Sequence, residues 1–259
     1  MRGERTDRRG VGGEQVEGRQ AVRELLLTGR RRVREVLLAA DLDPAPIIDE
    51  IIDLADEAKV TVREVSRGRF DATARTEAPQ GVLAFAAPLR DLALEELLGP
   101  EGADPPFLLL LDGLTDPGNV GAIMRTAECA GVSGVVLPRH HAARVTPTVT
   151  KASAGAIEHL PIAQVSSIAG AVARLIELEV WTVGLDMTAD QTVHGLDVAR
   201  GPVALVLGAE GTGLSRLVRE RCDLIVNIPL RGRLDSLNVA AAAAVACFEV
   251  ARVRSSPGA

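Results

Sequence analysis

The chain has 259 residues, of which 47% are hydrophobic and 25% charged, and its formal net charge is −6 at pH 7. This length suits one large globular domain or two modest ones, and the composition is ordinary for a globular protein. The apolar runs are too short for a bilayer, which needs about 20 residues, so we expect no membrane partner. The negative charge and the scarcity of aromatic residues argue against a simple cationic binder or a stacking platform for single-stranded nucleic acid.

The N-terminal end is locally basic. Residues 1–15 are charged and Gly-rich without an apolar core, so we expect a flexible tail and not a signal peptide. The run "GRRRVR" follows soon after and contains Arg30, Arg31 and Arg32. These three arginines are the candidate residues for contact with nucleic-acid phosphates, because arginine contacts phosphates without reading the base sequence. The alternative is a solvated run of charge.

Residues 16–88 are expected to form a small α/β/α domain. Apolar residues at three- and four-residue intervals indicate helices, and alternating or β-branched runs indicate strands. The expected elements, in chain order, are helix 18–29, strand 33–40, helix 45–59, strand 60–65 and strand 80–88. A linker follows at 89–106, with a short helix and then a break rich in Pro, Gly and Asp.

Residues 107–259 alternate strands with helices. The first strand, "FLLLLDGL", is almost wholly apolar, as expected for a strand buried on both faces of a parallel sheet. Further strands are expected at 134–138, 160–165, 180–185, 203–208 and 224–230, with helices at 119–131, 146–157, 167–178 and 214–221 and a final Ala-rich helix. This alternation predicts an α/β fold, a doubly wound parallel sheet flanked by helices. Ligands bind beyond the C-terminal ends of such strands, which draws attention to loops 112–119, 208–213 and 229–236.

The first of these loops contains a Pro-Gly turn followed by Asn119, a good helix N-cap. Arg125 lies six residues later and therefore projects from a different face of the helix. By pattern alone, Arg125 is equally well explained as a surface residue.

The second loop, "GAEGTG", is Gly-rich but lacks the G-x-G-x-x-G spacing of dinucleotide-binding folds. Glu210 inside this loop would repel a pyrophosphate. A nucleotide held by its phosphates therefore fits poorly, and a structural turn explains the glycines at least as well.

The third loop ends in Ser-Leu-Asn before the Ala-rich helix. An N-cap role explains Ser236 fully, whereas Asn238 would be a mediocre residue inside a helix. Asn238 is therefore the stronger candidate for a functional role, and Ser236 could serve both as a cap and at a binding site.

Three segments, "DPGNVGAIMRTAECAG", "LVLGAEGTGLS" and "IPLRGRLDSLNVAAAAA", resemble the motifs of SpoU-type RNA 2′-O-ribose methyltransferases of the SPOUT class, in the same order and spacing. The resemblance covers about residues 107–253. The N-terminal segments "VEGRQAVRELLLTGRRRVREVLLA" and "TEAPQGVLAFA" are similar to the substrate-binding domain of the subgroup that methylates a guanosine in 23S ribosomal RNA. The resemblance implies S-adenosylmethionine as methyl donor without a metal, an RNA substrate, a homodimer with shared sites, and a C-terminal trefoil knot over about residues 203–245.

The resemblance also implies roles for individual residues. The positions that match functional residues of the family are Asn119, Arg125, Glu210, Ser236 and Asn238. Gly208, Ile228 and Leu237 match its cofactor contacts, and Gly213 and Pro229 from the same loops are added as candidate cofactor-binding residues. One departure is the charged "RGRLD" before Ser236, where the family commonly has small residues, and this difference bears on the choice of substrate.

Other functions remain open at this stage. The RNA could be transfer RNA or an antibiotic-resistance site on ribosomal RNA. A catalytically inactive RNA-binding or ribosome-assembly protein is an alternative from another class, and a nicotinamide oxidoreductase is disfavoured by the missing glycine fingerprint. Cys129, Cys222 and Cys247 are far apart in sequence without metal-ligand spacing, so we expect reduced thiols in a cytoplasmic protein.

Overall fold

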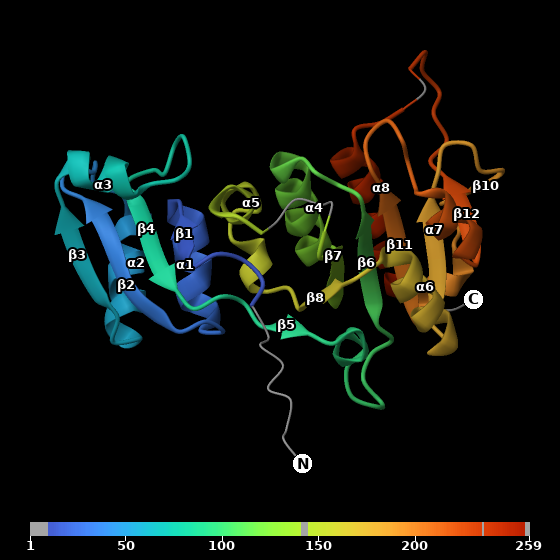
Figure 1. Cartoon of the computed structure of the whole chain (residues 1–259), viewed down its shortest axis with the longest axis horizontal. Helices are drawn as coiled ribbons and strands as arrows, with labels where there is room; N and C mark the ends of the chain where they lie inside the picture. The colour runs from blue at the N-terminus through green and yellow to red at the C-terminus, as the bar shows by residue number, and fades with distance from the viewer. Residues whose placement is uncertain (1–9, 141–144, 235, 257–259) are drawn as a thin grey trace.

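A computed structural model describes residues 10–140, 145–234 and 236–256, which form two sheets side by side along the long axis of the molecule (Figure 1). The smaller sheet has the order β1-β4-β2-β3, with β2 and β3 parallel and the other neighbours antiparallel. Its strands are β1 (Gln15–Glu17), β2 (Val33–Ala39), β3 (Thr61–Val65) and β4 (Val82–Ala86).

Helices cover both faces of this N-terminal sheet. On one face, α1 (Arg19–Thr28) and α2 (Pro46–Glu57) bury Leu25 and Ile51 against β2 and β4. On the other face, the short α3 (Arg67–Thr73) buries Phe70. The expected α/β/α arrangement is present. Helix α1 ends at Gly29, whose φ of 60° is the left-handed conformation that glycine adopts readily.

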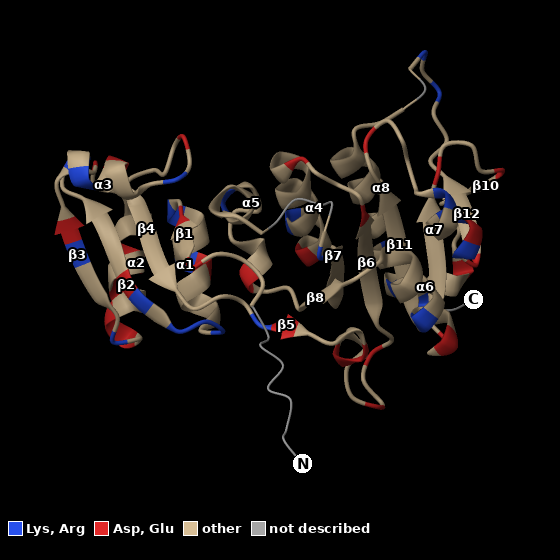
Figure 2. Ribbon diagram, in the orientation of Figure 1, with Lys and Arg blue, Asp and Glu red and all other residues tan. Residues whose placement is uncertain are grey.

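The larger sheet has eight strands, and all of its neighbouring strands are parallel. Their order is β10-β12-β9-β11-β6-β7-β8-β5. The bounds are β5 (Asp91–Leu92), β6 (Phe107–Asp112), β7 (Gly134–Pro138), β8 (Ile162–Val165), β9 (Trp181–Leu185), β10 (Gln191–Thr192), β11 (Val203–Gly208) and β12 (Leu224–Asn227). Acidic and basic residues are interspersed along the ribbons of both domains (Figure 2).

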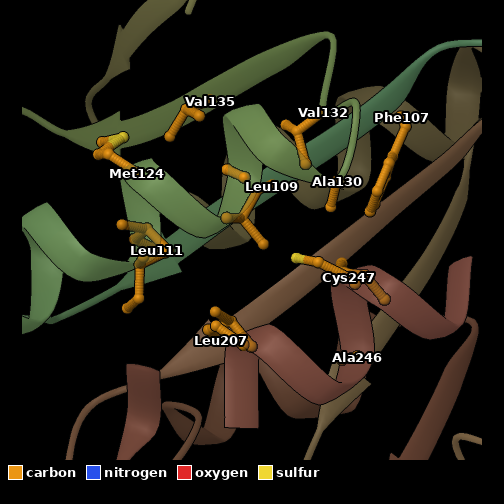
Figure 3. Packing of buried hydrophobic residues seen from close by; sticks show 14 of the residues in the cluster. Phe107, Leu109, Leu111, Met124, Ala130, Val132, Val135, Leu207, Ala246 and Cys247 are labelled. Atoms are coloured by element: carbon orange, nitrogen blue, oxygen red, sulfur yellow. The ribbon is translucent and has the colours of Figure 1, made fainter. Parts of the chain in front are cut away.

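Two helical layers bury this sheet. Helices α4 (Pro117–Cys129), α5 (Pro147–Ala152) and α8 (Val239–Ser255) cover one face. Helices α6 (Ile168–Glu177) and α7 (Arg216–Arg221), with the 3-10 helix η1 (Leu94–Leu98), cover the other. The residues of β6 alternate between these two cores, as those of a strand must. Figure 3 shows Leu109 and Leu111 of β6 packed with Met124 of α4 and Cys247 of α8. The α/β prediction is therefore confirmed.

The expected helix 146–157 is in fact two elements, α5 and the 3-10 helix η2 (Ala156–Glu158). Between them, Ala154 and Gly155 have φ angles of 51° and 85°. Right-handed helices do not tolerate positive φ, so the chain turns here. The apolar spacing continues through the turn, which is why the break was not predicted.

Two segments expected to be irregular are partly structured. The tail predicted at 1–15 lies in part outside the described residues, but Val11 is buried and exchanges two backbone hydrogen bonds with Leu89 (2.8 and 2.9 Å). The predicted linker 89–106 contributes β5 to the edge of the large sheet and packs η1 against β7 and β8. Both segments are thereby attached to folded domains.

In the described part of the chain, no helix is long and apolar enough to cross a membrane. The trefoil knot implied by the resemblance stays a prediction.

We expect Glu249 of α8 to make stability depend on pH. The hydrogen bonds from Arg252, helped by the Gly195 amide, outweigh the effect of burial and hold the pKa of Glu249 at about 2, against an ordinary 4.5. Because the folded pKa is the lower one, this stabilisation is present above pH 4.5 and is lost as the pH falls toward 2. Glu249→Gln should lower the free energy of unfolding by about 2 kcal/mol at pH 7, with a smaller difference at pH 3.

Urea unfolding of both proteins over this pH range measures the effect. Glu220→Gln is the control, because Glu220 is an exposed partner of Arg216 and should change stability by less than about 0.5 kcal/mol. An equal loss for Glu249→Gln at pH 7 and pH 3 would rule out the ionised carboxylate as the cause.

Candidate active site

A ligand-sized cavity of about 730 Å³ lies at the C-terminal ends of β9, β11 and β12. It is where the rule for open parallel sheets predicts a ligand. Gly208, Gly213, Ile228 and Leu237, four of the five candidate cofactor-binding residues, line this cavity. Three of the candidate catalytic residues, Glu210, Ser236 and Asn238, line it as well.

Three candidate catalytic residues from three loops are hydrogen-bonded to one another. The Asn119 amide donates to Glu210 Oε2 (3.2 Å), and the Asn238 amide donates to Glu210 Oε1 (2.9 Å) and to Asn119 Oδ1 (3.0 Å). Asn119 is 91 residues from Glu210 and 119 from Asn238 in sequence. The hydrogen bonds thus connect the three loops that the sequence analysis singled out at the C-terminal ends of strands.

The helix caps differ from the prediction. Asp116, and not Asn119, caps α4, because its Oδ1 accepts a hydrogen bond from the backbone nitrogen of Asn119 at 2.6 Å. Asn238, and not Ser236, caps α8, with Oδ1 accepting from the backbone of Ala240 and Ala241. Ser236 lies ahead of the helix. The Asn119 side chain, free of a capping role, can therefore reach Glu210.

The Gly-rich loop is a tight turn that presents Glu210. Ala209 and Gly213 exchange two backbone hydrogen bonds (2.9 and 3.1 Å), and Gly211 and Gly213 have φ angles of 79° and 67°. A Cβ atom at Gly208 would overlap the backbone of Gly213 and Leu214. The glycine at 208 is therefore required by the turn itself, in addition to any ligand.

A fourth loop, after β9, was missed from the sequence. Leu185, Asp186, Met187 and Thr188 also line the cavity. Burial opposes ionisation of Asp186, but hydrogen bonds from Thr188 and the charge of Arg219 (Nε at 3.0 Å) lower its pKa overall. This loop also follows a parallel strand, so applying the strand-end rule to every strand would have found it.

Asn119, Arg125 and Pro229 do not line the cavity. Pro229 lies between two lining residues, Ile228 and Leu230. Arg125 is exposed on α4 and has no hydrogen bond or ion pair with the described part of the chain. The segment "RGRLD" is the one that differs from the pattern of the resembled family. Its Arg231 and Arg233 are exposed on the loop before α8, and Asp235 lies outside the described residues.

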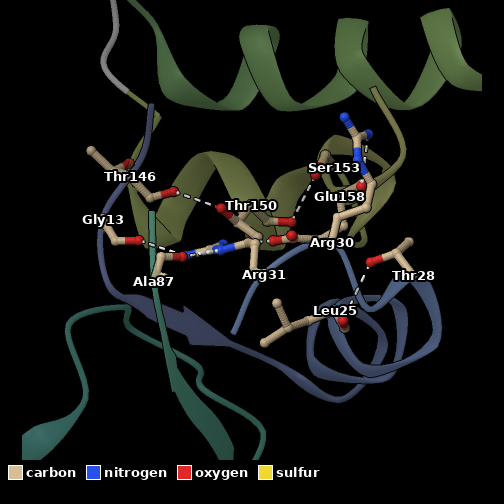
Figure 4. Close-up of polar contacts among 10 residues, drawn as sticks. All are labelled: Gly13, Leu25, Thr28, Arg30, Arg31, Ala87, Thr146, Thr150, Ser153 and Glu158. Carbon is tan, nitrogen blue, oxygen red and sulfur yellow. Dashed lines mark hydrogen bonds and ion pairs between the residues drawn. The ribbon is translucent and has the colours of Figure 1, made fainter. Parts of the chain in front are cut away.

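The three candidate RNA-binding arginines have different surroundings. Arg30 and Arg32 are exposed, whereas Arg31 is buried between the two domains, and each of its three side-chain nitrogens donates to a protein acceptor (Figure 4). Arg31 is therefore not exposed for contact with a phosphate in this structure, and its assignment as an RNA contact stays a prediction. A run of arginines gives no indication of which one has a buried partner far along the chain.

In the described ranges, no group of three or more His, Cys, Asp or Glu side chains could hold a metal ion. Cys129, Cys222 and Cys247 are free thiols. Burial raises the pKa of Cys222 and of Cys247 to about 12, so neither is a nucleophile near neutral pH.

Both domains match families of known proteins. Residues 106–248 match the SpoU rRNA Methylase family, and residues 15–92 match the family described as RNA 2′-O ribose methyltransferase substrate binding. The chain is 38% identical over 247 residues to the TrmH-family protein YacO of Bacillus subtilis, covering 95% of this chain and 98% of that protein. It is also 38% identical over 244 residues to the 23S rRNA (guanosine-2′-O-)-methyltransferase RlmB of Pseudomonas putida, covering 93% and 97%.

Solved structures agree with these relationships. The SpoU methyltransferase AviRb of Streptomyces viridochromogenes, in complex with the cofactor AdoMet, superposes with a TM-score of 0.75 at 27% identity, over 93% of this chain and 90% of AviRb. An AdoMet-bound rRNA methyltransferase of Sinorhizobium meliloti gives 0.74 at 25% identity, over 92% and 86%. The motifs, the fold and the relatives agree, and the chain belongs to the SpoU rRNA methylase family of RNA methyltransferases.

Proposed function

We propose that this protein transfers a methyl group from S-adenosylmethionine to a ribose 2′-hydroxyl of RNA, and that its target is a guanosine of 23S ribosomal RNA. The observation that carries the proposal is the cavity lined by Glu210 and Asn238, whose side chains are hydrogen-bonded to each other and to Asn119. Similarity to RlmB over 93% of the chain supports the choice of target. Such an enzyme would work in the cytoplasm, where its thiols stay reduced.

The cavity suits the methyl donor. Its volume of about 730 Å³ is typical of small-molecule sites. Leu207, Ile228 and Leu237 provide apolar walls for an adenine ring, and polar lining groups such as Thr188 and Glu210 suit hydroxyl and amino groups. When bound, S-adenosylmethionine supplies a methyl group on a positively charged sulfur.

The residues of this chain would position the RNA and would not remove the proton from its ribose 2′-hydroxyl. A guanidinium stays protonated in proteins, so Arg125 is a poor general base. We assign it two roles: binding the phosphate next to the target ribose, and stabilising negative charge that develops on the 2′-oxygen. One such electrostatic contact is worth about 3–4 kcal/mol. Glu210, held by Asn119 and Asn238, keeps the Gly-rich loop in place beside the donor.

The exposed position of Arg125 supports a homodimer with shared sites. Helix α8 packs beside α4 and carries an exposed stripe of Ala241, Val245 and Phe248 at helical spacing, with Phe248 50% exposed. An apolar stripe of this kind is typical of an interface. We propose that the stripe is the dimer seam and that Arg125 completes the cavity of the partner subunit.

We expect Arg125→Ala to abolish methyl transfer and to leave affinity for S-adenosylmethionine unchanged, because Arg125 does not line the cavity of its own chain and its assigned contacts are to the RNA. Transfer of tritiated methyl to ribosomal RNA and calorimetry with the donor measure the two effects. Ribose mapping of RNA from a strain that lacks this protein identifies the nucleotide whose 2′-O-methyl group is missing. Expression of the wild-type protein should restore that methyl group. The control is Arg174→Ala, an exposed arginine of α6 paired with Glu95. Wild-type turnover by Arg125→Ala would contradict the role of Arg125, and a methyl group missing from transfer RNA alone would contradict the target.

Mixing two inactive variants tests the shared site. If Arg125 acts across the dimer, equal amounts of Arg125→Ala and Asn238→Ala, exchanged into mixed dimers, should recover about a quarter of wild-type activity, because half of the dimers then contain one complete site. If Arg125 acts within its own chain, the mixture stays inactive.

Phe248→Asp should give monomers in ultracentrifugation, and a dimeric Phe248→Asp protein would argue against the seam.

The exposed Arg32 should contact RNA phosphate. Arg32→Ala is expected to weaken binding of a ribosomal RNA fragment and to reduce the slope of log affinity against log salt by about 1. Filter binding at several salt concentrations measures the slope, with Arg174→Ala again as control. An unchanged slope would exclude this contact.

A further inference from the structure

Arg31 binds three separate segments of the chain at the boundary between the two domains (Figure 4). Nε donates to the carbonyl oxygen of Ala87 (2.6 Å), and Nη2 donates to that of Gly13 (2.7 Å). Nη1 donates to Glu158 Oε1 at 2.8 Å. Gly13 and Ala87 flank β1 and β4 of the N-terminal domain, and Glu158 belongs to η2 of the catalytic domain. The planar guanidinium fork directs donors from three nitrogens to the three acceptors, whereas a lysine ammonium has its donors on one nitrogen.

The pair is fully buried. The side chains of Arg31 and Glu158 are 3% and 0% exposed. Burial raises the pKa of Glu158, although the nearby charges of Arg31, Arg30 and His159 oppose this shift. Glu158 Oε2 has no hydrogen-bond partner among the described residues. The carboxylate therefore depends on Arg31, and removing one partner would leave a buried group uncompensated, a strongly destabilising change.

The surfaces around the pair are in close contact. A Cβ atom at Gly155 would come within 2.7 Å of Glu24 Cβ and 3.0 Å of Ala21 Cα, so only glycine lets this turn approach α1. Glu24 Oε2 also lies 2.8 Å from His159 Nε2. Only residues 87–90 separate β4 of the N-terminal sheet from β5 of the catalytic sheet. The domain boundary is thus a packed joint and not a loose tether.

We propose that Arg31 and Glu158 are positioning residues, forming a clasp that holds the substrate-binding domain in one orientation on the catalytic domain. The inference rests on the proposed function in one respect, since the clasp would set the distance between the RNA held by the first domain and the methyl-donor cavity of the second. Binding at two sites with a fixed spacing raises the effective concentration of the target ribose at the cavity. Loss of the fixed domain orientation removes that advantage and leaves the methyl-donor cavity unchanged.

The orientation is measured with the full-length protein. Spin labels at Glu57→Cys of α2 and Glu177→Cys of α6, in a Cys129→Ser background, report the interdomain distance. Both label sites are exposed, and the thiols of the half-buried Cys222 and the buried Cys247, with pKa values of about 12, react slowly with the label. Dilution with unlabelled chain keeps each measured distance within one subunit.

We expect one narrow distance distribution for the parent protein and a broad one for Arg31→Met and for Glu158→Ala. Glu158→Gln keeps the acceptor oxygen for Arg31 and should restore the narrow distribution. Arg174→Met is the matched control, because Arg174 pairs with Glu95 at 2.9 Å but is 47% exposed. If Arg31→Met fails to fold, Glu158→Ala carries the same test.

Kinetics separate positioning from folding. In the two opened variants, KM for ribosomal RNA should rise about tenfold, while kcat and affinity for S-adenosylmethionine stay within about twofold of the parent, since neither residue touches the donor cavity. A narrow distribution in Arg31→Met and Glu158→Ala would overturn the clasp. A broad distribution with unchanged KM would overturn its role in positioning RNA. If the parent protein methylates no RNA, the proposed function fails, whereas the distances still test the clasp.

Discussion

The candidate site depends on one carboxylate, Glu210, held between the first turns of two helices. Asn119 reaches it from α4 and Asn238 from α8. Helix N-termini carry partial positive charge, which favours an anion there. Asn238 meets two needs at once, because its oxygen caps α8 while its amide nitrogen donates to Glu210. An aspartate would repel Glu210, and a serine would be too short, so asparagine alone fits both contacts. Without this link, the loops around the cavity would have no common anchor.

Much of the fold follows from local pattern. The central strands of the parallel sheet, such as β6 and β11, are buried on both faces, so their apolar runs stand out, and the helices between the strands show the complementary spacing. The short strands β1, β5 and β10 and the helix α3 were not expected, because two to seven residues leave too little periodicity. Their formation depends on the neighbouring strand or core, which local sequence does not describe.

For the site, residue types and strand ends were informative, but pairings were not. The resemblance singled out Glu210 and Asn238, yet only the structure shows which asparagine caps and which one reaches across. The three adjacent arginines look equivalent in sequence, and Arg31 differs because of Glu158, which is 127 residues away. Contacts over such separations leave no trace in a single sequence. The loop after β9 was missed for another reason, since the strand-end rule had not been applied to every strand.

The strand order has a consequence for how the chain folds during synthesis. All strands of the smaller sheet come from the first 86 residues, so that domain can collapse early. The middle of the larger sheet instead pairs β6 with β11, about 96 positions later, and its core is closed by Cys247 and Val250 near the end of the chain. Long loops must close before these contacts form, which slows folding. The ribosome must therefore nearly complete the polypeptide before the catalytic half acquires its interior, and until then Phe107 and its neighbours are exposed to solvent or chaperones.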